Sequence, residues 1–351
     1  MKVKIVADQL CDSEADFAPA AHLVRRLIER SRLPEFVALT KPRVMMLAVF
    51  TALVGLVNAP VRLEPFVAFV AVLAIAAGAG GAGVLNMWYD ADIDAVMKRT
   101  AMRPIPRGKV SRSEALVFGL VLAAAAVAGL ALATNITAAA LLAGAILFYV
   151  VVYTAVLKRS TRQNIVIGGA AGALPPVIGW AAATGDIGLQ PLVLFLIIFL
   201  WTPPHFWALA LNRCDEYARA GVPMLPVVAG RTATTRQILV YSALLAIASV
   251  LPWALGFAGP IYGAIAAICG ALFLGLAFQL SRSGEADRRA AYRLFVFSIS
   301  YLFVLFAAVS IDRSASASPS SRSSHGARID AGSSVAMQIK PSSTNVRTRE
   351  V

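Results

Sequence analysis

Long apolar stretches, separated by short polar ones, make up most of this 351-residue chain. A transmembrane helix needs about 20 mostly apolar residues. Nine segments meet that requirement, at residues 43–60, 65–89, 114–134, 137–157, 164–184, 190–211, 237–257, 259–281 and 291–311. The pattern therefore predicts an all-α membrane protein built as a nine-helix bundle.

Composition supports a membrane protein and excludes other classes. Hydrophobic residues make up 58% of the chain and charged residues 15%. A soluble domain carries about 25% charged residues. The mean hydropathy is +0.72. An ordinary soluble enzyme and a disordered or fibrous chain are both excluded.

The net charge of +13 raises the question of a nucleic-acid partner. Four longer connections between the predicted spans carry 17 Lys and Arg residues, whereas the four short ones carry only Arg62. Basic residues collect in cytoplasmic loops. The asymmetry predicts a cytoplasmic N-terminus and, with nine spans, a periplasmic C-terminus. Topology explains the positive charge, so we expect no nucleic-acid partner.

The two ends of the chain differ from the apolar middle. Residues 1–34 mix acids with bases and have no apolar core, unlike a secretory signal or a mitochondrial presequence. Residues 313–351 are rich in Ser, and we interpret them as a disordered tail. Residues 35–312 form the predicted membrane domain, and a bacterial inner membrane is the expected location. The three cysteines are far apart and predict neither a disulfide framework nor a zinc site.

A row of polar side chains ends the second predicted span. Asn86, Asp90 and Asp94 are four residues apart, so they share one helical face, whereas Asp92 points elsewhere. Two carboxylates and an amide oxygen suit Mg²⁺, which completes its shell with water and substrate phosphates. We expect a magnesium site here. The alternative is a solvated helix end with incidental acids.

Basic side chains gather next to this row. Lys98, Arg99 and Arg103 follow it directly, and arginine binds phosphate oxygens through paired hydrogen bonds. The fourth span ends near Tyr153, Lys158 and Arg159, which add hydroxyl and cationic donors. A metal-holding row beside a basic loop predicts a diphosphate site, although a charge run that only sets topology is the alternative.

The sixth span ends in a second unusual stretch, Trp201-Thr-Pro-Pro-His-Phe-Trp207. Proline within a span frees backbone carbonyls, so His205 lies beside a distortion in the apolar region. His205 is either a satisfied hydrogen-bonding residue or a ligand. Asp215 is the acid we expect to face the first row across the bundle, with Glu216 as its solvated neighbour.

The Asn86-x-x-x-Asp90-x-x-x-Asp94 row resembles the first signature of the UbiA-type intramembrane prenyltransferases. Further stretches are similar to the haem-farnesylating branch of that superfamily over residues 35–312. These stretches are Leu39-Thr-Lys-Pro-Arg43, Tyr153-Thr-Ala-Val-Leu-Lys-Arg159, Asn164-Ile-Val-Ile-Gly-Gly169, Pro175-Pro-Val-Ile-Gly-Trp180, the Trp201–Trp207 stretch and Ala220-Gly-Val-Pro-Met-Leu-Pro226.

The resemblance implies a nine-helix bundle around a central cavity, with Mg²⁺ and farnesyl diphosphate held by the first row. It implies transfer of the farnesyl group to the 2-vinyl group of haem b, with addition of water. His205 and Trp207 are the expected haem-binding residues. The superfamily has a second acidic row after the sixth helix. Only Asp215 and Glu216 are present there, so Asn212, Asp215 and Tyr217 are expected to serve its position in part.

Two other functions remain open from the sequence. A related prenyltransferase acting on 4-hydroxybenzoate or a chlorophyllide would share the aspartate row and differ in its acceptor pocket. A transporter would place its charged residues near the bilayer midplane, whereas the acids here lie at span ends. A haem A synthase is a possible partner that would receive the product.

Overall fold

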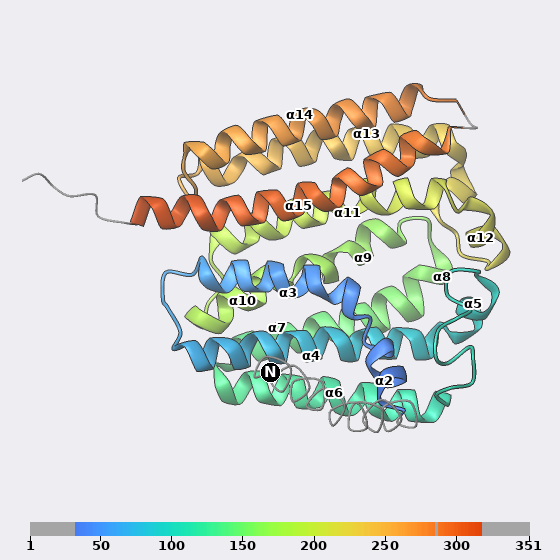
Figure 1. The fold of residues 1–351 in the computed structure, drawn as a ribbon, viewed down its shortest axis with the longest axis horizontal. Helices are drawn as coiled ribbons and strands as arrows, with labels where there is room; N and C mark the ends of the chain where they lie inside the picture. The colour runs from blue at the N-terminus through green and yellow to red at the C-terminus, as the bar shows by residue number, and fades with distance from the viewer. Residues whose placement is uncertain (1–31, 285–286, 318–351) are drawn as a thin grey trace, which may run out of the picture. The chain divides into compact units, whose positions relative to one another are not determined.

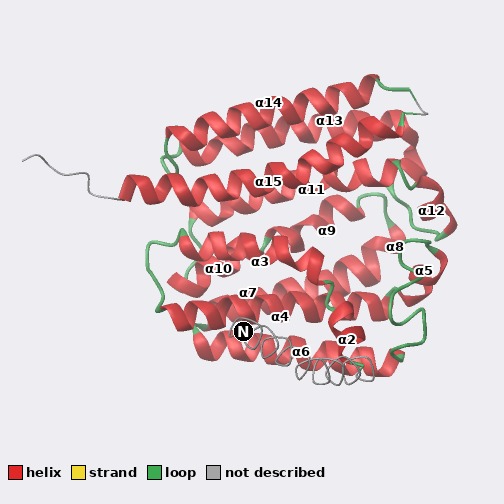
Figure 2. Ribbon diagram, in the orientation of Figure 1, coloured by secondary structure: helices red, strands yellow, loops and turns green. Residues whose placement is uncertain are grey.

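The computed structural model describes residues 32–284 and 287–317. Every regular element among these residues is a helix, as Figure 2 shows. The prediction of an all-α protein is confirmed. In chain order the helices are α2 (Leu33–Leu39), α3 (Pro42–Val57), α4 (Pro65–Tyr89), α5 (Ala91–Val96), α6 (Arg112–Ala133), α7 (Ile136–Leu147), the π-helix η1 (Phe148–Leu157), α8 (Lys158–Ser160), α9 (Asn164–Ala173), α10 (Pro175–Thr184), α11 (Leu189–Leu211), α12 (Cys214–Arg219), α13 (Leu225–Ala254), α14 (Pro260–Arg282) and α15 (Arg288–Ala317).

Eight helical segments of the described chain are long and apolar enough to cross a membrane. The first predicted span, 43–60, corresponds to α3, which has 16 residues and is too short alone. The number becomes nine if α2 and α3, bent by 55°, count as one broken span. The bend lies at Lys41, whose backbone is left-handed, and Pro42 then begins α3.

The spans pack around two large apolar cores, and a third, smaller core joins α2, the end of α4, α5 and the start of α6. One core is formed by α3, α4, α6, α7 and α10, where α4 packs along α6 and α3 along α10. The other lies mainly between α11, α13, α14 and α15, and α9 packs against α11. In Figure 1 the elements of the first core lie in the lower part of the bundle and α13, α14 and α15 in the upper part.

Two glycines allow α3 and α10 to approach closely. A Cβ atom at Gly55 would lie 2.0 Å from the carbonyl oxygen of Pro176, and one at Gly179 would lie 2.0 Å from that of Ala52. Small residues permit such backbone contact between membrane helices. The short α3 is thereby fixed against the bundle.

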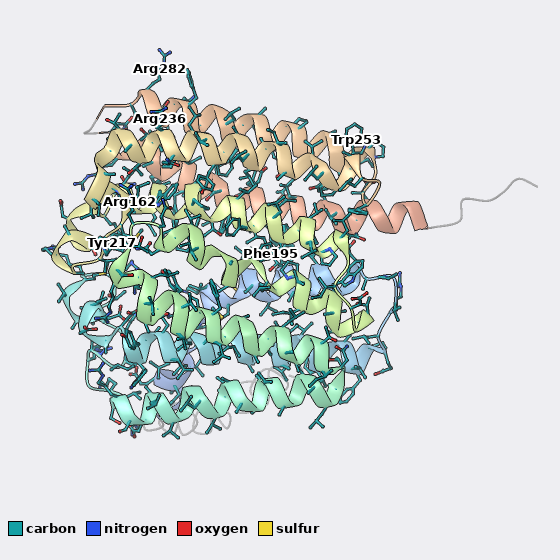
Figure 3. The ribbon with its side chains drawn as sticks, turned by 180° about the vertical axis from the view of Figure 1, so that it is seen from behind. Arg162, Phe195, Tyr217, Arg236, Trp253 and Arg282 are labelled. Carbon is teal, nitrogen blue, oxygen red and sulfur yellow. The ribbon has the colours of Figure 1, made fainter. Side chains whose placement is uncertain are left out.

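The polar connections collect at one end of the bundle. The short helices α5, α8 and α12 lie together at the right of Figure 1. Arg162, Arg236 and Arg282 lie at the same end as Tyr217 in Figure 3, whereas Trp253 lies at the opposite end. The predicted grouping of basic residues on one side is thus visible in the fold. The predicted terminal segments lie mostly outside the described residues, although α15 continues to Ala317.

Candidate active site

The predicted polar row lies at the junction of α4 and α5. Asp90 caps the end of α4 and precedes α5, and backbone hydrogen bonds from Asp90 to Asn86 and from Asp94 to Asp90 keep the four-residue spacing across the junction. Asn86 Nδ2 donates to Asp90 Oδ2 at 2.8 Å. All three side chains are buried, and Asp90 is 0% exposed. A buried carboxylate is costly unless it is paired, so the side chains that contact these acids show how the row is stabilised.

Each member of the row has a cationic partner from a different part of the chain. Lys158 Nζ at the start of α8 donates to Asp90 Oδ2. Arg103, in the loop after α5, donates to Asp94 Oδ2 at 2.6 Å. Lys41, between α2 and α3, donates to Asn86 Oδ1 at 2.6 Å. The row is therefore an ionic cluster rather than a solvated helix end.

Asp92 lies outside the row, as its helical position predicts. Its exposed carboxylate accepts two hydrogen bonds of 2.8 Å from Arg159, which also reaches Asp90 Oδ1 at 3.6 Å. These hydrogen bonds lower the pKa of Asp92 to about 2 because they stabilise its charged form. A cavity of about 260 Å³ opens beside this pair, between α5, α8 and the Arg219–Gly221 turn.

A π-helical segment, η1, brings two tyrosines and a threonine to the row. Thr154 Oγ donates to the carbonyl of Tyr149 at 2.8 Å and accepts from Asn86 Nδ2 at 3.0 Å. Tyr153 stacks on Tyr149 with a centroid separation of 5.4 Å. Gly168 of α9 leaves room for the Tyr153 ring. π-Helical turns occur frequently at functional sites.

Across the bundle, α12 presents a different acid from the predicted one. The side chain of Asp215 is exposed, whereas Glu216 is largely buried and pairs with Arg213 at 2.8 Å. We expected Asp215 inside and Glu216 in solvent, and the structure reverses these positions. Tyr217 follows, and burial raises the pKa of its phenol against the opposing charges of Arg99 and Arg213.

Only some of the basic residues predicted for the site contact its acids. Arg103 and Arg159 contact the acids of the row and its neighbour. Arg99 lies near Tyr217 instead, and Lys98 is exposed.

Sequence reasoning assigned no site role to Lys41 or Thr154. The available signal for Lys41 was a lysine directly before a proline at a span start. Lys41 is the only residue other than glycine with a positive φ, 55°, in the described part of the chain. A left-handed backbone at such a residue is strained and needs support from its surroundings.

His205 and Trp207 lie on α11, inside the bundle. His205 Nδ1 is 2.6 Å from Ser298 Oγ on α15, and its ring stacks between Trp201 and Phe295. Trp207 is fully enclosed and makes an edge contact with Tyr241 of α13. Its indole Nε1 has no hydrogen-bond partner among the described residues.

The donor set of the row fits Mg²⁺. Asn86, Asp90 and Asp94 offer hard oxygen ligands, which Mg²⁺ prefers. Asp90 Oδ1 is fully buried and accepts no hydrogen bond within the described chain. A buried carboxylate oxygen without a hydrogen bond is costly, and a cation at this position would stabilise it. Four cationic side chains contact this cluster, which contains three carboxylates, those of Asp90, Asp92 and Asp94. The cationic side chains are Lys41, Arg103, Lys158 and Arg159. Because the cations outnumber the carboxylates, the cluster also attracts an anion.

The comparisons with known proteins identify the family to which this helical bundle and its polar row belong. A model of the UbiA prenyltransferase family matches residues 48–299. The chain therefore belongs to the UbiA prenyltransferase family, and the resemblance seen in the sequence is confirmed.

Relatives of known name match nearly the whole membrane domain. A protein from Afipia carboxidovorans named "Protoheme IX farnesyltransferase" is 58% identical over 293 residues, which cover 83% of this chain and 94% of that protein. One from Mesorhizobium japonicum, "Protoheme IX farnesyltransferase 1", is 60% identical over 278 residues, or 79% of this chain and 89% of that one.

Solved structures share the fold at low sequence identity. A digeranylgeranylglyceryl phosphate synthase structure superposes with a TM-score of 0.67 at 20% identity, covering 80% of this chain and 98% of that one. A UbiA homologue from Archaeoglobus fulgidus, bound to GPP and Mg²⁺, gives a TM-score of 0.56 at 19% identity, covering 79% and 99%. At this identity the likeness shows the fold alone, and it confirms the predicted fold class.

Proposed function

We propose that this protein transfers a farnesyl group from farnesyl diphosphate to the 2-vinyl group of haem b, with addition of water, and releases haem O and diphosphate. The observation that carries the proposal is the 58% identity to a protein named protoheme IX farnesyltransferase over 94% of that protein's length. The buried polar row supplies the chemistry that such a transfer requires.

The proposed reaction forms a carbon–carbon bond and a carbon–oxygen bond at the vinyl group, and it breaks the C1–O bond of farnesyl diphosphate, the π bond of the vinyl group and one O–H bond of water. The C1–O bond of farnesyl diphosphate breaks, and its electron pair leaves with the diphosphate. The vinyl carbon of the haem supplies the electrons for the new carbon–carbon bond to C1. Water then adds its oxygen to the cationic carbon left on the haem side and loses a proton, which completes the hydroxyethylfarnesyl group.

Asn86, Asp90 and Asp94 are the residues that would hold Mg²⁺. When bound, Mg²⁺ offsets the negative charge that develops on the departing diphosphate. The solved Archaeoglobus relative, bound to GPP and Mg²⁺, supports this assignment by its fold. The buried Asp90 Oδ1, which accepts no hydrogen bond in the described chain, supports it from this chain itself.

The basic residues of the cluster bind and orient the diphosphate. Lys158, Arg103 and Arg159 already surround the carboxylates, and arginine pairs well with phosphate oxygens. Cations fixed in advance around the leaving group stabilise the transition state because they need no reorganisation. We assign Arg99, near Tyr217, and the exposed Lys98 to the capture of the incoming diphosphate.

The aromatic and acidic residues complete the proposal. We assign Tyr153, stacked on Tyr149, to the wall that excludes water from the allylic centre. The sequence predicts Asp215 as a further metal ligand in the position of the second acidic row, but its exposed side chain favours Glu216 as the acid of α12 that faces the site. His205 and Trp207 are the proposed haem-binding residues on α11.

The proposal includes a location and a product acceptor. The end of the bundle that carries the site and the basic residues faces the cytoplasm of a bacterial inner membrane, with the N-terminus inside and the C-terminus in the periplasm. Haem O is too apolar to leave the membrane readily, so a haem A synthase in the same membrane is the proposed recipient.

The deciding experiment is an assay in isolated membranes with haem b, farnesyl diphosphate and Mg²⁺, read by mass spectrometry. We expect a haem that has gained a farnesyl group and one water. Asp90→Asn and a metal chelator should each abolish this product. Farnesyl transfer to 4-hydroxybenzoate or a chlorophyllide in place of haem would keep the site and replace the acceptor.

A further inference from the structure

His205 sits in a cage built by α11 and α15. Its ring stacks on Trp201 at a centroid distance of 4.2 Å and on Phe295 at 4.7 Å, with interplanar angles of 18° and 25°. Trp201 Nε1 donates to the backbone carbonyl of Ser298 at 2.8 Å. Both faces of the imidazole are therefore covered, and only its edges can meet a ligand.

The hydrogen bonds around Ser298 determine which imidazole nitrogen carries the proton. Ser298 Oγ lies 2.6 Å from the carbonyl oxygen of Phe295 and 2.6 Å from His205 Nδ1. A hydroxyl has one hydrogen, and a carbonyl oxygen can only accept. The Ser298 hydroxyl therefore donates to Phe295 and accepts from Nδ1–H, which leaves Nε2 of the neutral ring without a proton.

Nε2, the other imidazole nitrogen of His205, lies at the edge of the ring that the stacked aromatic side chains leave uncovered. No hydrogen bond reaches Nε2 from the described residues, and Nε2 is not among the fully buried polar atoms that lack a partner. His205 as a whole is 8% exposed. A histidine serving only as packing would have both nitrogens satisfied, whereas this one presents an unprotonated nitrogen at an accessible edge.

We infer that Ser298 is a positioning residue that fixes the tautomer and plane of His205, so that Nε2 ligates the iron of the haem acceptor. The inference rests on the proposed function. Imidazole suits iron, whereas Mg²⁺ prefers oxygen ligands. A metal-ligating histidine commonly donates its other N–H to a fixed acceptor, which sets its orientation.

The depth of His205 agrees with this role. It lies six residues before the end of α11 at Leu211, which is about 9 Å along the helix axis at a rise of 1.5 Å per residue. His205 would therefore hold the iron within the apolar part of α11 rather than at its polar end.

The first test reads the tautomer directly, without haem. The chain has three histidines, so a 15N-histidine spectrum of the purified protein is simple to assign with a His205→Ala control. We expect His205 to be neutral with its proton on Nδ1. Ser298→Ala should give a mixture of tautomers, and Ser298→Thr, which keeps the hydroxyl, should restore the single form.

A matched control is Ser242→Ala on α13, since Ser242 is equally buried and bonds only to a backbone carbonyl of its own helix. It should leave the histidine spectrum unchanged. A proton on Nε2 in the wild type, or an unchanged tautomer in Ser298→Ala, would overturn the inference.

The second test measures haem ligation. Titrated with haem b, the wild type should show the absorption spectrum of a nitrogen-ligated iron, and His205→Ala should lose it. Ser298→Ala should bind haem about 10–100-fold more weakly, as is typical when the partner of a ligating histidine is removed. An identical haem spectrum in His205→Ala refutes the iron-ligand role. Histidine ligation without farnesyl transfer would instead support the inference and refute the proposed function.

Discussion

Replacement of Gly168 by alanine should damage the site through a single added methyl group. A Cβ atom there would lie 2.2 Å from Cδ2 and 2.7 Å from Cε2 of Tyr153, whereas ordinary contacts begin at 3.4 Å. The Tyr153 ring must therefore retreat by more than 1 Å. It has little space to do so because it stacks on Tyr149. Overpacking of this kind costs about 1–3 kcal/mol.

The chain offers a matched control on the same helix. Gly172, also on α9, has no atom within 4 Å of the position that a Cβ would occupy. Gly172→Ala should stabilise the protein by up to about 1 kcal/mol, because alanine is the better helix former. The free energy of unfolding should therefore fall for Gly168→Ala and rise for Gly172→Ala, although the chemical change is the same. Equilibrium unfolding in mixed detergent and SDS micelles measures both free energies.

Activity should separate the two variants further. Tyr153 adjoins Thr154, which accepts the hydrogen bond from Asn86, so a displaced η1 moves a residue of the polar row. A shift of about 1 Å near reacting groups can lower the rate about 100-fold. We expect such a loss in turnover for Gly168→Ala and wild-type turnover for Gly172→Ala. Equal stability and turnover in the two variants would refute the contact between Tyr153 and α9.

Three further outcomes test the ionic cluster. Lys158→Met should lower the free energy of unfolding by about 3 kcal/mol, because it leaves the buried Asp90 carboxylate without its closest partner, and Asp90→Asn in the same chain should restore part of this loss. Mg²⁺ should raise the thermal midpoint of the wild type and not of Asp90→Asn in a detergent melting assay, since a ligand stabilises only the state that binds it. Glu216→Gln should reduce farnesyl transfer more than Asp215→Asn, because Glu216 is the acid turned inward with Arg213.

The polar row was predictable because its information is local. Helical periodicity places Asn86, Asp90 and Asp94 on one face, and the structure keeps this spacing although α4 ends at Tyr89. Hydropathy likewise located the spans, since apolar length is a property of each segment alone. It placed the first span at 43–60, where α3 needs α2 to complete a crossing. A backbone bend at Lys41 has no signature in hydropathy.

The partners of the row were less predictable because they come from distant parts of the chain. Lys158 is 68 residues from Asp90, and Lys41 is 45 residues from Asn86. Proximity in sequence favoured Lys98, Arg99 and Arg103, of which only Arg103 reaches the row. A basic residue at a span end has a topological reason to be there in any case. Only the packing of the helices shows which of these residues also neutralises a buried acid.

The reversal at α12 shows how one residue of helical phase changes a site assignment. Asp215 and Glu216 are adjacent, so about 100° separates them around the helix and only one can face the bundle. That choice depends on where α12 starts. Arg213, with φ −134° and ψ 24°, breaks the helical path after α11, and α12 begins anew at Cys214. The Arg213–Glu216 ion pair then holds Glu216 on the less exposed side of α12, whereas Asp215 lies on the exposed side.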